Sequence, residues 1–484
     1  MVVVFGLVAL AVLGVLVAGN WYLWRRLFRD TTRGPGWVRR AGAVLIAGGW
    51  VLTIGALVAE RAGAPFGLQQ ALAWPGFLWL ALALYLLLAV LAGELVRPLL
   101  RRLLERRAAA RTPVPAAPDR DPARDEAPAR IPAGTAPART PEGERPAAPE
   151  PPASAGAPAA EPAAPGSTPG STVSGAAVSG AVPSGAVPSG AVPSGAVPSG
   201  GVPPDRSLAV PSRRLFVSRV VGGAAAAAAL GTVGHGTYGV LRGPRVKRVT
   251  VPLARLPRAA HGYRIAVVSD VHLGPVLGRG FAQKVVDTIN GTRPDLIAVV
   301  GDLVDGSVQD LGPAAAPLAQ LQARHGSYFV TGNHEYFSGA GQWIEEVRRL
   351  GLLPLENART ELPHFDLAGV NDVAGETEGQ GPDFARALGD RDRARACVLL
   401  AHQPVQIHEA VDHGVDLQLS GHTHGGQLWP GNLIAGAANP TLAGLERYGD
   451  TQLYVSRGAG AWGPPTRVGA PSDITVIELA SRQA

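Results

Sequence analysis

The sequence of 484 residues contains one cysteine, Cys397. A single thiol can form neither an intrachain disulfide nor a cysteine-based zinc knuckle, so both are excluded as sources of stability. Because Cys397 lies in a short apolar run, we expect a buried thiol on a β-strand.

Basic residues outnumber acidic ones, with 44 Lys and Arg against 38 Asp and Glu, which points to a nucleic-acid or membrane partner. Many arginines lie within residues 25–40 and 97–111, beside long apolar runs. Membrane proteins place cations in such positions. We therefore predict contact with membrane lipids and no nucleic-acid partner.

Charged residues are absent from residues 2–23, a run long enough as an α-helix to cross the ~30 Å hydrocarbon core of a bilayer. No basic segment precedes this run, which argues against a signal peptide. Two further apolar runs, residues 41–58 and 75–95, have a similar length. We predict a membrane domain over residues 1–111, with three transmembrane helices and a basic tail.

Arginine also sets the predicted orientation of these helices. The loop between the first two runs is rich in arginine, whereas residues 60–73 hold only Arg61 as a cation. Since cations favour the cytoplasmic side, the N-terminus is predicted outside and the third helix is predicted to end inside. The basic tail up to Arg111 then starts at the cytoplasmic face, where anionic lipid would attract it.

Proline, alanine, glycine and serine dominate residues 112–211, which include a five-residue repeat within residues 179–199. This composition buries too little apolar area to offset the entropy lost on ordering. We predict an extended, disordered linker on the cytoplasmic side.

A second basic and apolar segment, residues 212–241, follows the linker. Arg213 and Arg214 precede Leu-Phe and a weakly apolar, alanine-rich stretch. This pattern resembles a twin-arginine export signal, which makes the twin-arginine export machinery a candidate partner. A retained fourth transmembrane helix is the alternative. Both interpretations carry residues 242–484 out of the cytoplasm.

In residues 242–484, short β-rich runs alternate with helical stretches, which is typical of a layered α/β fold. Five predicted strands end in a polar motif. These motifs are Asp270-Val271-His272, Gly301-Asp302, Gly332-Asn333-His334-Glu335, Ala401-His402 and the run from Gly421 to Gly426 that contains His422 and His424. The α/β rule gathers such motifs at one sheet edge. Carboxylates mixed with imidazoles suit divalent Mn, Fe or Zn, and a shared carboxylate suits two adjacent ions.

By the order and spacing of these motifs, residues 263–479 resemble the calcineurin-like metallophosphoesterase superfamily. The motifs that begin at Ser269, Gly332 and Ser420 resemble more narrowly its YkuE/YaeI-like branch of membrane-associated or exported bacterial proteins. The resemblance implies a calcineurin-like β-sandwich flanked by helices, with two divalent metal ions. It implies one metal held by Asp270, His272, Asp302 and His424, and a second held by Asp302, Asn333, His402 and His422.

His334 belongs to neither ligand set, which suits a group that donates a proton to the leaving oxygen or stabilises charge there. The resemblance implies that Asp305 orients it. Ser/Thr protein phosphatases have Arg-Gly after the Gly-Asp motif, whereas this chain has Gly306-Ser307, which argues against protein phosphatase activity.

Three further features of the chain match none of the motifs. Asn371-Asp372 fits an Asx turn and a place in the cleft equally well. Trp429 and Trp462 are expected in the core rather than beside the site. Six histidines match no motif and are expected at the surface or in the core: His235, His261, His325, His364, His408 and His413.

The sequence therefore predicts a multi-pass plasma-membrane hydrolase whose catalytic domain lies outside the cytoplasm. Its expected substrate is a phosphorylated small molecule or a lipid-linked envelope phosphate. A noncatalytic membrane receptor that binds a phosphoryl ligand at the same metal site is the alternative from another class. Loss of a ligand or of His334 would favour the receptor, and none is lost.

Overall fold

The computed structural model describes residues 2–109 and 212–483. The predicted linker, residues 112–211, lies outside the described residues. The two described parts of the chain belong to one compact unit.

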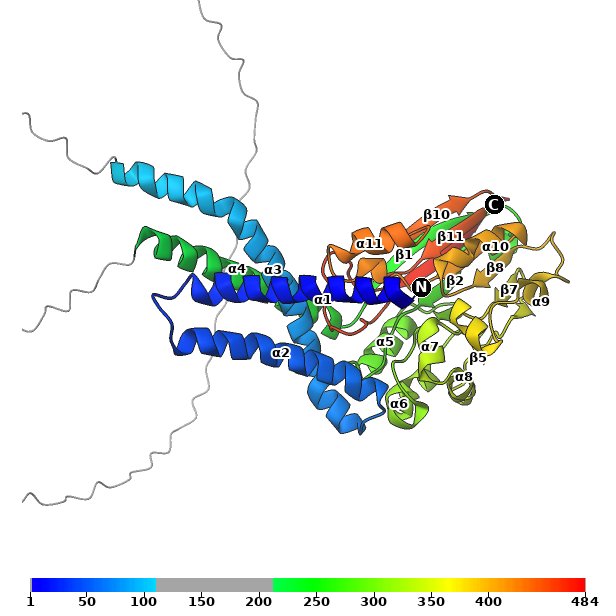
Figure 1. Ribbon diagram of the computed structural model, residues 1–484. Helices are drawn as coiled ribbons and strands as arrows, with labels where there is room; N and C mark the ends of the chain where they lie inside the picture. Colours follow the sequence, from blue (N-terminus) through cyan, green and yellow to red (C-terminus); the bar gives the residue numbers. More distant parts are fainter. Residues whose placement is uncertain (1, 110–211, 484) are drawn as a thin grey trace, which may run out of the picture. The chain divides into compact units, whose positions relative to one another are not determined.

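Four long helices form from the apolar runs (Figure 1). They are α1 (Val2–Trp24), α2 (Trp37–Arg61), α3 (Phe66–Ala109) and α4 (Arg213–Leu241). A short π-helical turn, Arg25–Arg29, follows α1. Within the described residues, α2, α3 and α4 are long and apolar enough to cross a membrane.

Helix α3 is much longer than the predicted span of residues 75–95. The predicted span starts at Pro75, yet Pro75 and Pro98 both lie inside the helix. At Gly76, the backbone approaches α2 closely, and the Thr53 hydroxyl donates a hydrogen bond to the Gly76 carbonyl (2.8 Å). This hydrogen bond joins α2 to α3 one residue after Pro75.

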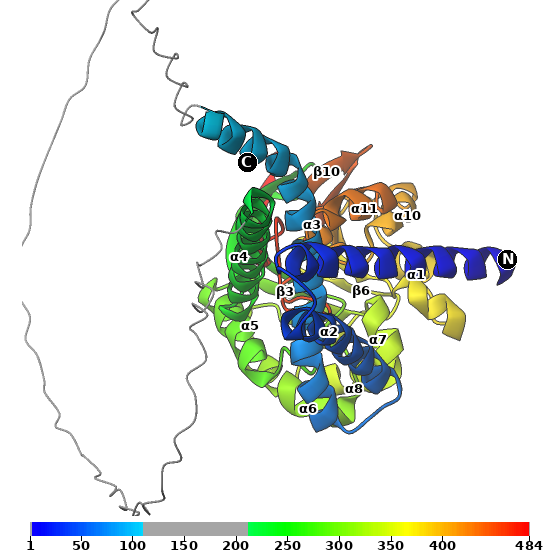
Figure 2. The ribbon, with the colours of Figure 1, turned by 60° about the vertical axis from the view of Figure 1, so that its left-hand side comes forward.

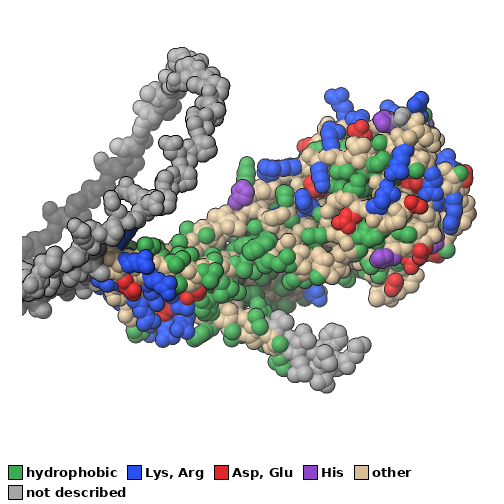
Figure 3. All heavy atoms as spheres, turned by 90° about the horizontal axis from the view of Figure 1, so that it is seen from above, with side chains coloured by type: hydrophobic (Ala, Val, Ile, Leu, Met, Phe, Trp, Pro, Cys, Tyr) green, Lys and Arg blue, Asp and Glu red, His purple; other side chains and the backbone are tan. Residues whose placement is uncertain are grey.

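One end of the helices carries paired arginines. Arg26 lies 2.9 Å from Glu94, and Arg219 donates a hydrogen bond to the Thr31 carbonyl (3.0 Å). The α1–α2 connection, the second half of α3 and the start of α4 therefore lie together. Figure 3 shows Lys and Arg side chains gathered at the end of the helices away from the α/β part, with hydrophobic side chains between.

The opposite end of the helices packs on the α/β part. Phe66 and Leu241 contact its hydrophobic core, and the Leu241 carbonyl accepts a hydrogen bond from Lys284 (2.6 Å). Thr237 of α4 lies 2.8 Å from Thr466, hydroxyl to hydroxyl. In Figures 1 and 2 the turn between α2 and α3 lies beside α6 (Val308–Ala315).

Two six-stranded sheets form the α/β part. The first has the order β1 (Arg245–Leu253), β12 (Asp473–Ser481), β2 (Tyr263–Val268), β3 (Leu296–Val300), β4 (Ser327–Val330) and β5 (Leu353–Pro354). The second has the order β10 (Gly444–Tyr448), β11 (Thr451–Val455), β9 (Leu417–Ser420), β8 (Cys397–Leu400), β7 (Asp366–Gly369) and β6 (Ala358–Glu361). β2 to β5 pair in parallel, as do β7, β8, β9 and β11.

One hydrophobic core lies between the sheets and joins residues of both. In β2, Ile265 and Val267 face this core, whereas Ala266 and Val268 face the helices on the outer side. The helices that pack on the outer faces are α5 (Arg279–Gly291), α6, α8 (Ala340–Arg349), α9 (Phe384–Leu388) and α10 (Ile407–Asp412). Two further helices are α7 (Asn333–Ser338) and α11 (Gly431–Ala438). The predicted α/β sandwich flanked by helices is confirmed, and Cys397 is buried at the start of β8.

Candidate metal centre

The polar motifs meet where β2, β3 and β4 of one sheet and β8 and β9 of the other reach their carboxyl ends. Two clusters of possible metal ligands share Asp302, as the predicted bridging ligand would. One is Asp270, His272, Asp302 and His424, and the other is Asp302, His402 and His422. A third possible cluster, His272, Asp305 and His334, shares His272 with the first. The amide oxygen of Asn333, the remaining predicted ligand, lies 3.0 Å from Nδ1 of His422.

The imidazoles converge on Asp302 and on one another. The Nε2 atoms of His272 and His424 lie 2.9 Å apart. Nε2 of His402 lies 3.1 Å from the Oδ2 atom of Asp302, and Nε2 of His272 lies 3.9 Å from the same oxygen. Carboxylate oxygens and imidazole nitrogens at this spacing match the ligand preferences of divalent Mn, Fe and Zn.

Two buried polar atoms are turned toward the place where a cation would lie. Asp270 Oδ2 is buried without a hydrogen-bond partner, and Nε2 of His402 is buried with the Asp302 carboxylate 3.1 Å away. The other ring nitrogen of His402 donates to the Val300 carbonyl (2.9 Å), which fixes the orientation of the ring. An unpaired carboxylate oxygen and a ring nitrogen directed at the shared carboxylate fit a bound metal ion.

Backbone strain is concentrated at the same residues. Five of the seven predicted ligands have a positive φ: Asp270 (50°), His272 (48°), Asp302 (53°), His422 (71°) and His424 (52°). A non-glycine residue in a sparsely populated region costs on the order of 1–3 kcal/mol, and such residues gather at functional sites. The packing around the motifs therefore holds these side chains in place against a conformational cost.

Gly301, directly before Asp302, allows the loop after β3 to lie against the loops after β4 and β8. Its φ is 72°, and a Cβ at this position would lie 2.5 Å from Nδ1 of His402 and 2.7 Å from Cα of Gly332. A side chain here would push the β3, β4 and β8 loops apart.

Glu335 fixes the loop that carries Asp302. Its buried carboxylate accepts hydrogen bonds from three backbone N–H groups, those of Asp302 (2.9 Å), Leu303 (2.8 Å) and Gly332 (2.6 Å). The His334 backbone N–H in turn donates to the Asp302 carboxylate (2.9 Å). Sequence reasoning gave Glu335 no role, although its place three residues after Gly332 is that of a helix-capping residue.

Asp305 joins the metal cluster to His334. Its Oδ1 atom lies 2.8 Å from Nδ1 of His272 and 2.7 Å from Nδ1 of His334. Burial raises the pKa of Asp305, but the two histidines outweigh it and lower the pKa to about 2. Burial lowers the pKa of His334, but the hydrogen bond and charge of Asp305 raise it to about 9. His334 is therefore protonated at neutral pH.

His424 has the opposite electrostatic environment. Burial, His272 and Arg467 hold the pKa of His424 well below its usual value. Arg467 is buried and donates to the backbone carbonyls of His424 (3.0 Å) and Gly460 (2.6 Å). Arg467 lies outside the motifs and was not predicted at the site. Arg467 also lies 3.1 Å from Nδ1 of His424, so it holds the outer edge of the ring, while Nε2 faces the metal site, 2.9 Å from Nε2 of His272.

Two expectations about tryptophan were wrong. Trp462 is 57% exposed, and its ring centroid lies 5.6 Å from that of His334, because the loop after β11 carries it over the site. Trp429 is 52% exposed, and its carbonyl accepts a hydrogen bond from Tyr85 of α3 (2.9 Å). Their place at the contact between the α/β part and the membrane helices explains why neither is in the core.

Asp372 forms the Asx turn that the sequence allowed. One oxygen accepts hydrogen bonds from the Ala374 backbone N–H (2.8 Å) and the Gln403 side chain (2.9 Å). Within the described residues, the six histidines outside the motifs join none of the candidate metal clusters.

Comparison with known proteins matches residues 263–426 to the calcineurin-like phosphoesterase family model. A zebrafish (Danio rerio) transmembrane protein with metallophosphoesterase domain is 37% identical over 259 residues, covering 51% of this chain and 59% of that protein. A Helicobacter pylori metallophosphoesterase is 36% identical over 273 residues, which cover 56% of this chain and 73% of that protein. The Bacillus subtilis metallophosphoesterase YkuE is 29% identical over 280 residues, which cover 56% of this chain and 98% of YkuE. The match thus spans about three fifths of the zebrafish protein.

Proposed function

Because this chain belongs to the metallophosphoesterase family, we propose that it is a membrane-anchored enzyme that hydrolyses phosphoester or phosphoanhydride bonds at a binuclear metal centre. The observation that carries the proposal is the pair of ligand clusters that share Asp302. A shared carboxylate is the arrangement expected where two cations act on one phosphate.

The proposed ligand sets are those implied by the motifs. Asp270, His272, Asp302 and His424 would hold one divalent ion, and Asp302, Asn333, His402 and His422 would hold the other. When bound, the two ions supply charge neutralisation for the nonbridging oxygens and lower the pKa of the attacking water. Glu335 and Gly301 keep Asp302 at the position that both sets require.

His334 is the proposed proton donor. Burial lowers the pKa of His334, but Asp305 outweighs it and raises the pKa to about 9, which favours the charged form of the ring. It stands beside the ligand His272, with 4.7 Å between the ring centroids, so its outer edge can reach the leaving oxygen of a bound phosphoester. Asp305 positions the ring by its hydrogen bond to Nδ1 and would stabilise the protonated form.

The arrangement of the helices supports a catalytic domain outside the cytoplasm. Arg26 and Arg219 lie at the helix ends away from the α/β part, whereas Phe66 and Leu241 pack on it. Since arginine favours the cytoplasmic side, the α/β part falls on the opposite face of the membrane.

Turnover by the full chain tests the proposal. The purified protein in detergent would be loaded separately with Mn, Fe(II) and Zn and assayed against bis-p-nitrophenyl phosphate and p-nitrophenyl phosphate. Metal-dependent release of p-nitrophenol that Asp302→Asn abolishes is the expected result. Binding of inorganic phosphate without turnover of either compound, with any of the metals, would instead favour the receptor.

A further inference from the structure

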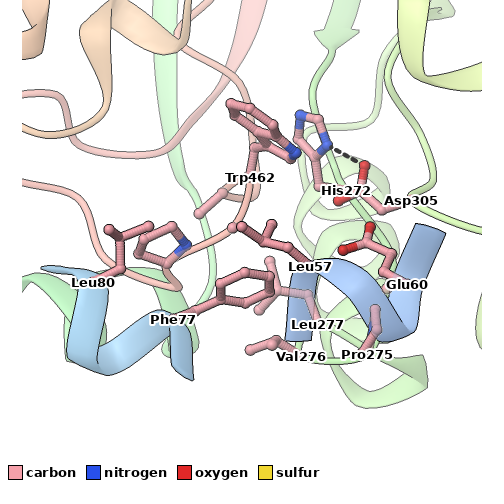
Figure 4. A pocket seen from close by; sticks show the side chains of 14 residues that line it. Leu57, Glu60, Phe77, Leu80, His272, Pro275, Val276, Leu277, Asp305 and Trp462 are labelled. Carbon is pink, nitrogen blue, oxygen red and sulfur yellow. Dashed lines mark hydrogen bonds and ion pairs between the residues drawn. The ribbon is translucent and has the colours of Figure 1, made fainter. Parts of the chain in front are cut away.

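A cavity of about 220 Å³ opens beside the metal centre, between it and the membrane helices (Figure 4). Helix α2 contributes Leu57 and Glu60 to its wall, and α3 contributes Phe77 and Leu80. The site itself contributes His272 and Asp305. The cavity therefore joins residues of two candidate membrane spans to the residues proposed for catalysis.

The cavity is polar at one end and apolar over the rest. Glu60 and Asp305 lie at the same end in Figure 4, while Leu57 and Phe77 lie between them and Leu80. The remaining wall is mostly apolar and includes Val276, Leu277 and Trp462. A ligand that fits this lining has a charged group at the metal centre and a hydrocarbon group next to it.

The side chains that α2 contributes show the same division into an apolar and a polar part. Leu57 and Glu60 are three residues apart, so they project from the same side of the helix, one turn after the other. The side chains of α2 therefore change from apolar at Leu57 to charged at Glu60. Glu60 lies at the same end of the cavity as Asp305, where the phosphate would lie. A nucleotide would place its polar base or ribose against the hydrocarbon part of the wall, where hydrogen-bond partners are few.

The size of the cavity indicates how much of a ligand it holds. Pockets that enclose most of a drug-sized ligand measure roughly 300–1,000 Å³, which is more than the 220 Å³ found here. The cavity can hold the segment next to the phosphate, while a longer chain would continue along α2 and α3. Their outer faces present exposed apolar side chains such as Ile54 and Leu91, as expected where helices meet lipid.

We propose that the substrate is a membrane lipid phosphoester whose hydrocarbon chain runs along the faces of α2 and α3 that line the cavity and lies against Leu57, Phe77 and Leu80 while its phosphate reaches the metal centre. This inference rests on the proposed phosphoesterase function. It assigns the two membrane helices a part in substrate binding as well as in anchoring.

Chain-length selectivity tests the inference. The full chain in detergent would be assayed with alkyl p-nitrophenyl phosphodiesters from methyl to dodecyl, each below its micelle-forming concentration. We expect kcat/KM to rise with chain length. Leu80→Trp should fill the cavity and exclude part of the alkyl chain. The dodecyl-to-methyl ratio of kcat/KM should then fall by at least about tenfold, which is the smallest change in kcat/KM expected for one methylene group in an apolar pocket.

Val15→Trp is the matched control, because Val15 lies on α1 with 73% of its surface exposed and belongs neither to the cavity wall nor to α2 or α3. Its dodecyl-to-methyl ratio should stay within about twofold of that of the unmodified chain. Metal content verifies that each variant has folded, and Leu57→Trp replaces Leu80→Trp if the latter loses its metal. The same tenfold fall is then expected.

The outcomes separate this inference from the proposed function. Equal turnover of all chain lengths, or an equal loss on every substrate in both cavity variants, would overturn the lipid proposal while leaving phosphoesterase activity in place. Faster hydrolysis of a dinucleotide than of the dodecyl ester would do the same. Absence of turnover of every compound would overturn both.

Discussion

His334 and His272 share one carboxylate oxygen: Oδ1 of Asp305 lies 2.7 Å from Nδ1 of the former and 2.8 Å from Nδ1 of the latter. The proposed proton donor and a proposed metal ligand are thus oriented by the same group. Replacing Asp305 would disturb metal binding and proton transfer together. Replacing His334 leaves the contact between Asp305 and His272 intact, so it isolates the role of the proton donor.

His334→Ala should therefore keep the metal ions and slow turnover by roughly 10²- to 10⁴-fold, the range for general acid catalysis. The loss should be largest for esters with poor leaving groups, because these depend most on protonation. Steady-state rates over a series of aryl and alkyl phosphodiesters measure this dependence. Full activity of the variant on an unactivated dialkyl phosphate would show that His334 is not the acid.

Asp302→Asn should remove both metal ions and all metal-dependent turnover, because the carboxylate belongs to both clusters. Elemental analysis of the full chain after gentle purification gives the metal content. Asp287→Asn is a suitable control, since Asp287 lies on the exposed side of α5. A metal-to-protein ratio near zero in the unmodified chain, not restored by added Mn or Zn, would contradict the binuclear centre.

Glu335→Gln should lower metal affinity by about 10- to 100-fold, the usual effect of losing a group that orients a ligand. Both carboxylate oxygens accept backbone N–H groups, so the amide NH₂ of glutamine would face a donor in either orientation. Competition with a chelator measures the affinity. Glu345→Gln, at an exposed position of α8, is the control. An unchanged affinity would mean that the Asp302 loop is held by other contacts.

Cys397 should resist alkylation in the folded protein and react fully after unfolding in guanidinium. The thiol is buried in β8, and burial raises its pKa to about 12, so little reactive thiolate is present at neutral pH. Incorporation of N-ethylmaleimide, followed by mass spectrometry, measures the reaction. Rapid labelling of a protein that keeps its native circular dichroism would contradict the burial, and the same assay checks the folding of every variant above.

The strand-end motifs were predictable because each is local: a β-rich run, a glycine, then a carboxylate or an imidazole. Glu335 stands inside such a motif, but its role depends on N–H groups of a second loop, which periodicity does not reveal. Strand β1 was missed since it is rich in charge and contains Pro252, and it pairs with β12 at the other end of the domain sequence. Glu60 and Trp462 reach the cavity only through tertiary contacts.

The sidedness of the catalytic domain gives the last prediction, because it decides which phosphoesters the site can meet. Helices α2, α3 and α4 place their arginine-paired ends together and their other ends on the α/β part. Reporters that fluoresce only inside the cell, or hydrolyse only outside, would be inserted after Gly63, after Ser189 and at the C-terminus. Gly63 suits an insertion because it lies in the exposed turn between α2 and α3. The positive-inside rule predicts outside, inside and outside in that order. A cytoplasmic signal at the C-terminus would reverse the predicted topology, and the lipid substrate would then have to be sought in the inner leaflet.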